Sequence, residues 1–103
     1  MSIGYRIMKL IKIGESSRKD KKMMAVFDVD GNGKHKTVHF GAAGYSDFTQ
    51  NHDEKRKERY LARHAKNEDW KDPTTAGALS RFVLWNKPTI AGSVRDFKNR
   101  FSV

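Results

Sequence analysis

The sequence contains no cysteine and only two prolines among its 103 residues. Without cysteine, disulfide bonds and thiolate metal sites are excluded, and the fold is indifferent to the redox compartment. No apolar run approaches the length of about 18 residues that a membrane-spanning helix requires. Residues 1–16 alternate apolar and basic side chains and lack the continuous apolar segment of a secretory signal. We therefore expect a soluble, intracellular protein that is not secreted.

Basic residues clearly outnumber acidic ones. Lysine and arginine total 21, against 12 aspartates and glutamates, which gives a formal net charge of +9. The excess is spread over both halves of the chain, and this argues against a disordered basic tail attached to a neutral domain. A charge of this sign suits a polyanionic partner such as DNA, RNA, an anionic lipid surface or an acidic protein surface. Basicity alone does not choose among these partners.

The length of the chain supports one domain with one modest core. Only 37% of the residues are hydrophobic but 11% are aromatic, so we expect a small core built around Phe, Trp and Tyr. The pattern of residue types divides this single domain, residues 1–103, into three parts. Residues 1–41 are strand-rich, residues 42–51 form a specific turn, and residues 52–103 are helical.

The strand-rich part has the two-residue period of β-structure. Residues 5–13 alternate in this way, with Tyr5, Ile7, Lys9, Ile11 and Ile13 sharing one face. Residues 23–41 predict two strands around a tight turn, in which Gly31 and Gly33 supply the positive φ angles that a hairpin needs. One face of this hairpin carries Ala25, Phe27 and Val29, followed by Lys36, Val38 and Phe40. We therefore predict three antiparallel strands.

The connector after this hairpin is unusually rich in residues with special backbone roles. It contains Gly41, Gly44, Ser46, Asp47 and Thr49, with the aromatic residues Tyr45 and Phe48 between them. We interpret Ser46 and Asp47 as turn and capping residues, because such side chains bond to nearby backbone N–H groups. Gly41, Gly44, Ser46 and Asp47 are thus assigned to a structural turn.

The period then changes to that of helices. Asn51 with Glu54 fits a capping box that opens a helix over residues 52–67. Asp72 followed by Pro73 predicts the start of a second helix, which runs to about residue 85.

A third helix follows Thr89, which is suited to cap it. Its apolar residues repeat at helical spacing and are Ile90, Val94, Phe97 and Phe101. The order of strands followed by helices predicts an α+β fold, in which three helices cover one face of a small antiparallel sheet.

The segment DVDGNG resembles the first half of a calcium-binding EF-hand loop. Asp28, Asp30, Asn32 and Gly33 would take loop positions 1, 3, 5 and 6. Position 12, however, is His39 and not the bidentate glutamate, and the flanking residues alternate as strands. We predict a hairpin turn here and no calcium site. His35 and His39 would lie about 13 Å apart on an extended strand, so we expect no zinc site, and no cofactor.

Catalysis would require a nucleophile with a base, or clustered carboxylates. Asp47, His52, Asp53 and Glu54 could form a nuclease-like cluster beside a basic helix, but their spacing matches no nuclease motif. The sequence also lacks a phosphate-binding glycine loop. We therefore assign no catalytic residues and expect a non-enzymatic protein, with a nuclease-like or host-directed factor as the third alternative.

A stripe of cations is the main candidate for a binding surface. Lys55, Arg56, Arg59, Arg63 and Lys66 recur with helical spacing and would line up along one side of the predicted helix. Such a stripe can follow a phosphate backbone. It can equally be a solvated helix face, since acidic residues balance part of its charge. We expect the aromatic residues Tyr45, Phe48, Trp70 and Trp85 to pack in the core or in an interface.

The string HFGAAGYSDFTQNHDEKRKERYLARH at residues 39–64, followed by Trp70, TAG at 75–77 and LWNKP at 84–88, carries a family resemblance. It resembles a family of small uncharacterised proteins encoded by large DNA viruses of algae and protists, and the resemblance covers residues 36–101. It implies a virion-associated structural protein, either a minor capsid or cementing subunit or a packaged internal protein. Its partners would be other virion proteins, and it would occur in the virion and in the host cytoplasm or nucleus.

The alternative function is a nucleic-acid-binding protein that uses the stripe from Lys55 to Lys66 without sequence specificity. These two functions share the same fold, because function depends on the site and not on the architecture.

Overall fold

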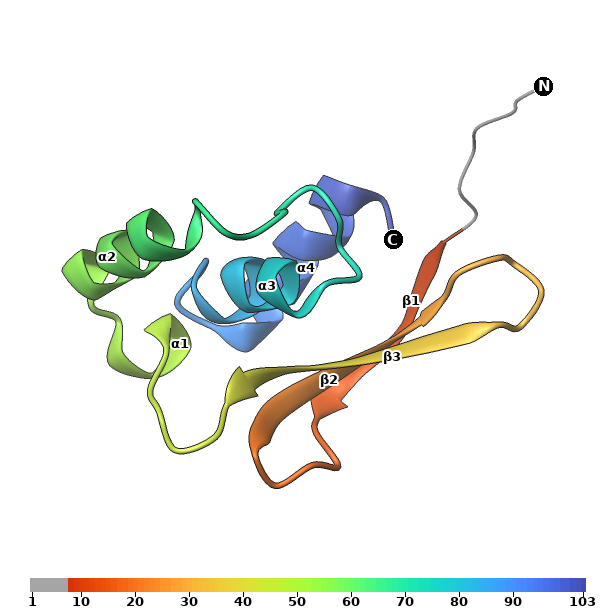
Figure 1. Cartoon of the computed structure of the whole chain (residues 1–103), viewed down its shortest axis with the longest axis horizontal. Coiled ribbons are helices and arrows are strands. Elements are labelled where there is room, and N and C mark those ends of the chain that lie inside the picture. The colour runs from red at the N-terminus through yellow and green to blue at the C-terminus, as the bar shows by residue number, and fades with distance from the viewer. Residues whose placement is uncertain (1–7) are drawn as a thin grey trace.

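The computed structural model describes residues 8–103. In this part of the chain three antiparallel strands come first, in the sheet order β1-β2-β3: β1 (Lys9–Glu15), β2 (Lys21–Asp28) and β3 (His35–Ala42). The helical elements follow: α1 (Phe48–Asn51), α2 (Glu54–His64), α3 (Ala76–Leu79), the π-helix η1 (Ser80–Leu84) and α4 (Ile90–Phe101). The predicted α+β class, a three-stranded antiparallel sheet followed by helices, is confirmed (Figure 1).

The hairpin of β2 and β3 forms at the predicted turn. Gly31 and Gly33 have φ angles of 77° and 89°. The Asp28 carboxylate accepts a hydrogen bond from the Gly31 N–H (2.9 Å), and the Asp30 carboxylate accepts one from the Asn32 N–H (2.7 Å). The carboxylates of the DVDGNG segment therefore stabilise their own turn, as Asx side chains commonly do.

β1 differs from the simple alternation that its sequence predicts. Its pairing with β2 shifts register between Leu10 and Lys12, so Ile11 lies in a β-bulge. Leu10 and Ile13 consequently pack against the core, whereas Ile11 is 52% exposed. The prediction that Ile11 and Ile13 share a face is wrong, because Ile11 is the extra, unpaired residue of the bulge and the alternation is interrupted there. The earlier part of the predicted strand, residues 5–7, lies outside the described residues.

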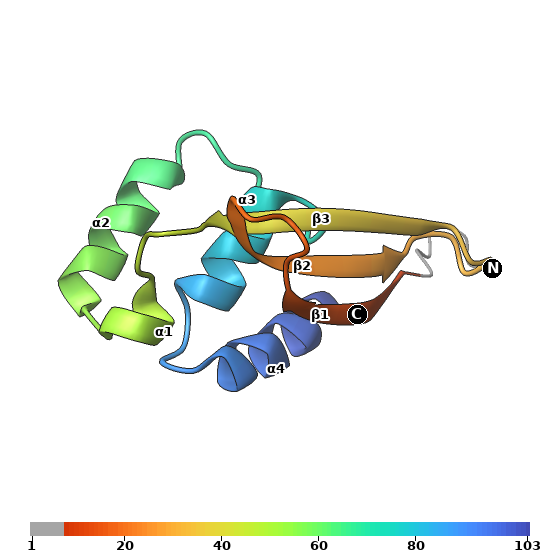
Figure 2. The ribbon, with the colours of Figure 1, turned by 90° about the horizontal axis from the view of Figure 1, so that it is seen from below.

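The core lies between one face of the sheet and the helices that follow α2. Helix α3 and η1 pack on β3, and α4 packs on η1. Helices α1 and α2 lie beyond the end of the sheet where β3 finishes, as both ribbon views show (Figures 1 and 2). The largest core side chains with no exposed surface are Phe27, Phe40, Leu79, Val83 and Phe97.

The first helical segment begins earlier than the sequence predicts. Asp47 caps α1 and forms a capping box with Gln50, inside the stretch 42–51 that was expected to be a turn. The chain then reverses at His52, whose φ is 53°, and α2 starts with Asp53 as its N-cap. The predicted capping box of Asn51 and Glu54 is therefore wrong, because two competing Asp caps divide this stretch into two helices.

The N-cap residues determine where the later helices start. The second predicted helix starts at Ala76 and not at Pro73, because the Thr75 hydroxyl accepts the hydrogen bond from the Ala78 N–H. That helix ends in η1, where the Trp85 N–H donates to the Ser80 carbonyl at 3.1 Å. Thr89 caps α4 as predicted.

Candidate functional site

The basic side of α2 borders a groove of about 650 Å³. Arg56, Arg59 and Arg63 line this groove along one wall, and all three side chains are exposed. Further lining comes from the start of β2, the end of β3, the connector to α1, and the elements α3 and η1. Lys55 and Lys66, the other two cations of the predicted stripe, are exposed but do not line the groove. The structure thus brings three of the five predicted residues to a concave surface.

The start of β2 contributes to the groove a cation that was not predicted from the sequence. Lys21 opens β2 and pairs with Ala42 at the end of β3, and both residues line the groove. The neighbouring Lys22 has a structural role, since its Nζ donates to Asp47 Oδ2 at 2.6 Å and to Gln50 Oε1 at 2.9 Å. The Lys21–Lys22 doublet in the sequence is a signal for this position, but only the strand register places Lys21 at the groove, beside Ala42.

Four cations of the groove are not neutralised by acidic neighbours. Within residues 8–103, Lys21 and the three groove arginines form no ion pair with a carboxylate. The two acidic residues of the lining are both engaged, Asp47 with Lys22 at 2.6 Å and Glu68 with His64 at 3.3 Å. The groove therefore carries a local excess of positive charge, which attracts anionic ligands.

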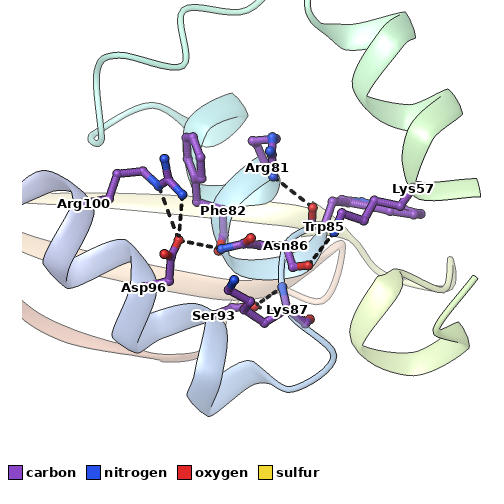
Figure 3. Close-up of polar contacts among 9 residues, drawn as sticks. All are labelled: Lys57, Arg81, Phe82, Trp85, Asn86, Lys87, Ser93, Asp96 and Arg100. Atoms are coloured by element: carbon purple, nitrogen blue, oxygen red, sulfur yellow. Dashed lines mark hydrogen bonds and ion pairs between the residues drawn. The ribbon is translucent and has the colours of Figure 1, made fainter. Parts of the chain in front are cut away.

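The inner side of α2 is fixed by aromatic stacking and by one lysine. Tyr60 stacks on Trp85 (centroids 4.5 Å apart) and on His64 (4.2 Å). Lys57 Nζ donates to the Asn86 carbonyl at 2.8 Å, as Figure 3 shows, and lies 4.6 Å over the Phe48 ring. Burial, together with nearby Glu68, raises the pKa of Tyr60 to about 12. These contacts hold the helix in place and leave its basic side to solvent.

The turn between η1 and α4 supports this anchor (Figure 3). Asn86 Nδ2 donates to Asp96 Oδ2 at 2.7 Å, and Arg100 donates to the same oxygen at 3.3 Å. The Ser93 hydroxyl accepts a hydrogen bond from the Lys87 N–H at 2.9 Å. Burial raises the pKa of Asp96, but the hydrogen bond from Asn86 and the charge of Arg100 outweigh it, and the pKa of Asp96 lies below its ordinary value.

The predicted structural turn forms part of the groove. Gly41, Ser46 and Asp47 line it, and Gly41 and Gly44 have φ angles of 80° and 91°. Asp47 is buried, which fits the capping role predicted for it, whereas the Ser46 hydroxyl accepts from the Asn51 side-chain amide at 3.3 Å. The turn therefore shapes the rim between the sheet and α1.

The aromatic residues that were expected in the core or in an interface differ in their exposure. Phe48 and Trp85 are buried as expected, with 3% and 8% exposure. Tyr45, by contrast, is 70% exposed and lines the groove. The neighbours of Tyr45 explain its exposure, because the positive φ of Gly44 turns the chain just before Asp47, the N-cap of α1.

Several of the residues considered for metal binding or catalysis are engaged in contacts within the fold. His39 Nδ1 shares a hydrogen bond with Ser16 Oγ at 2.8 Å, and the His52 imidazole N–H donates to the Pro88 carbonyl at 3.1 Å. Asp53 caps α2. Within residues 8–103, no three His, Asp or Glu side chains are grouped so that they could hold one metal ion.

The chain was compared with known proteins and searched for membrane-spanning helices. Among the helices of residues 8–103, none is both long and apolar enough to cross a bilayer. No curated protein and no solved structure matches the chain. A family model described as a family of unknown function (DUF5754) matches residues 11–64, a stretch that contains Lys21, Tyr45 and the three arginines of the groove. Because this match covers more than half of the 103 residues, the chain belongs to that family of unknown function.

Proposed function

We propose that this protein binds nucleic acid through the groove, without sequence specificity. The observation that carries the proposal is the convergence of Lys21, Arg56, Arg59 and Arg63 on one concave surface without carboxylate partners. Cations that are not engaged within the protein can replace the counterions condensed on a phosphate backbone, and this release drives association.

The residue types and their spacing fit a row of phosphate groups better than a single anionic group. Arginine presents a planar fork of donors that binds phosphate oxygens in pairs. From Arg56 to Arg63 the helix rises by about 10 Å, which allows contact with more than one phosphate. Contacts to phosphate position a protein on nucleic acid but carry no direct sequence information. Non-specific binding is therefore the activity that this surface supports.

Binding of a fluorescently labelled oligonucleotide, followed by anisotropy over a range of salt concentrations, tests the proposal. We expect the affinity of the parent protein to fall steeply as salt rises. The variant Arg56→Glu/Arg59→Glu/Arg63→Glu should lose binding and keep its fold, because the three side chains are exposed.

The matched control is Lys12→Glu/Arg95→Glu/Lys98→Glu. It changes the net charge equally, at exposed positions that do not line the groove. This control should retain most of the binding. If both triple variants lose affinity to the same extent, net charge and not the groove is responsible. If the parent protein binds no oligonucleotide even at low salt, the proposed function is wrong.

A virion-associated structural role, as a minor capsid or cementing subunit or as a packaged internal protein, is the second candidate. It rests on the viral resemblance, and one surface feature favours it. Ile11 and Tyr45, at 52% and 70% exposure, are the large hydrophobic side chains exposed within residues 8–103 and could contact other virion proteins. Quantitative mass spectrometry of purified particles tests this role, which requires the protein in stoichiometric amounts. Its absence from the particles would contradict a structural role.

A further inference from the structure

The exposed ring of Tyr45 stands where the groove meets a second hollow. This second hollow has a volume of about 710 Å³ and lies on the side of the β1–β2 turn, with Arg18 in its lining. Lys21, Lys22, Tyr45 and Ser46 line both hollows, so the two adjoin at the tyrosine. A ligand that occupies both hollows would therefore contact Tyr45.

The backbone that carries Tyr45 is held on both sides. On the N-terminal side, the Ala43 N–H donates to the Asp20 carbonyl at 3.1 Å. On the C-terminal side, Asp47 caps α1 and pairs with Lys22. The ring itself makes no aromatic or cation–π contact within residues 8–103. A fixed backbone thus presents an aromatic face that remains available to a ligand.

The surrounding charge distinguishes this tyrosine from an ordinary exposed aromatic residue. A single exposed apolar side chain on a protein surface needs no explanation. Tyr45, however, borders a groove that is also lined by Lys21 and by Arg56, Arg59 and Arg63 of α2, none of which pairs with a carboxylate within residues 8–103. Proteins that bind single strands combine these same two features, a positively charged groove for the backbone and aromatic rings on which bases stack.

We infer that the ligand of this groove is single-stranded nucleic acid, with one unpaired base stacked on Tyr45 and the adjoining phosphates held by Lys21 and the three arginines. The inference rests on the proposed function and narrows it. In a duplex the bases are stacked on one another and cannot cover an aromatic side chain, whereas the bases of a single strand can. The groove volume of about 650 Å³ lies in the usual range for sites that hold small ligands, which suits individual nucleotides.

The test compares probes and variants in one anisotropy experiment at constant salt. The probes are oligothymidylate, oligouridylate and a hairpin duplex that carry the same label and the same number of phosphates. The variants are Tyr45→Ala and Tyr45→Phe, with Ile11→Ala as a control for the loss of an exposed apolar side chain away from the groove. Melting curves establish that each variant is folded, which we expect because the Tyr45 ring is largely exposed.

Tyr45→Ala should weaken binding of the single-stranded probes by about tenfold, in line with the loss of one base stack. Tyr45→Phe and Ile11→Ala should bind like the parent protein, and Tyr45→Ala should bind the duplex like the parent. Equal effects on oligothymidylate and oligouridylate indicate a site for either nucleic acid. An effect on one probe alone assigns the site to DNA or to RNA.

Two results would overturn the inference. If Tyr45→Ala leaves single-strand binding unchanged while the triple arginine variant abolishes it, the groove binds nucleic acid without base stacking, and the proposed function survives alone. If Tyr45→Ala weakens binding of the duplex and of the single strands equally, the contribution of the tyrosine to binding does not depend on unpaired bases. Failure of the parent protein to bind any probe removes the inference and the proposed function together.

Discussion

Tyr60 and Trp85 stack almost parallel, with ring centroids 4.5 Å apart and ring planes inclined by 9°. Tyr60 belongs to α2, and Trp85 follows η1 directly, so this pair joins the helix that carries the basic side chains to the helical layer on the sheet. No residue of α2 is fully buried, and Tyr60 is half-buried against the core. The position of the groove arginines therefore depends on this contact, together with the hydrogen bond from Lys57 to Asn86.

Removal of the Tyr60 ring should loosen α2. We expect Tyr60→Ala to lower the free energy of unfolding by about 2 kcal/mol, from lost burial and lost stacking. Amide hydrogen exchange should accelerate across α2 more than in β2 or α4. Tyr60→Phe keeps both stacked faces and serves as the control. If α2 amides exchange at the parent rate in Tyr60→Ala, the stack does not position this helix.

The same tyrosine makes stability depend on alkaline pH. Burial raises the pKa of Tyr60 to about 12, from an ordinary value of 10.0. The folded state thus favours the neutral phenol, and its contribution to stability is fully present below pH 10 and is lost as the pH rises through 12. Melting temperatures of the parent protein and of Tyr60→Phe, compared from neutral to alkaline pH, should diverge above pH 10, with the parent falling faster. If the melting temperatures of the two proteins fall in parallel as the pH rises, the raised pKa of Tyr60 is contradicted.

Gly41 should tolerate alanine less well than Gly44. Both have φ angles in the left-handed region, 80° and 91°, so each substitution strains the backbone by about 1 kcal/mol. At Gly41 an added Cβ would also lie 2.6 Å from Leu84 Cδ1, whereas at Gly44 it would meet nothing within 4 Å. Urea unfolding should therefore show a larger loss for Gly41→Ala. Equal losses would show that Leu84 moves aside at little cost.

Phe97 should be essential for the packing of α4. Its side chain has no exposed surface and lies 5.1 Å from the Phe101 ring, measured between centroids. Truncation to alanine should cost about 3–5 kcal/mol, from lost transfer energy and the resulting cavity. The neighbouring exposed residue Lys98 provides a control, since Lys98→Ala should change stability little. A Phe97→Ala protein that melts within a degree or two of the parent would contradict this packing.

Local signals in the sequence are sufficient to predict the β2–β3 hairpin and the start of α4. Gly31 and Gly33 mark a turn with positive φ, and Thr89 precedes a helical repeat of apolar residues. The start of α2 is harder to predict, because Asn51 and Asp53 are both good N-cap residues. The left-handed conformation of His52 separates α1 from α2, and its imidazole bonds to the distant Pro88 carbonyl. A contact between residues so far apart in sequence leaves no local signal.

The groove residues likewise divide into those that local sequence patterns predict and those that contacts between distant residues bring together. Arg56, Arg59 and Arg63 share one side of a helix, and this follows from helical spacing alone. Lys21 joins them only because the register of β2 and β3 places it beside Ala42 at the end of the sheet near α2. The exposure of Tyr45 likewise depends on the path between β3 and α1, so its aromatic character alone does not predict whether it packs in the core or stays exposed.

The most direct test of nucleic-acid binding in the groove is an NMR titration of isotope-labelled protein with a short oligothymidylate at low salt. Binding there should shift the backbone amides of Lys21, Tyr45 and the segment from Arg56 to Arg63, and leave Lys12 and Thr37 on the sheet unchanged, since neither lines the groove. If the shifts concentrate around Lys12 and Thr37 and the groove amides are unperturbed, binding of nucleic acid in the groove is contradicted.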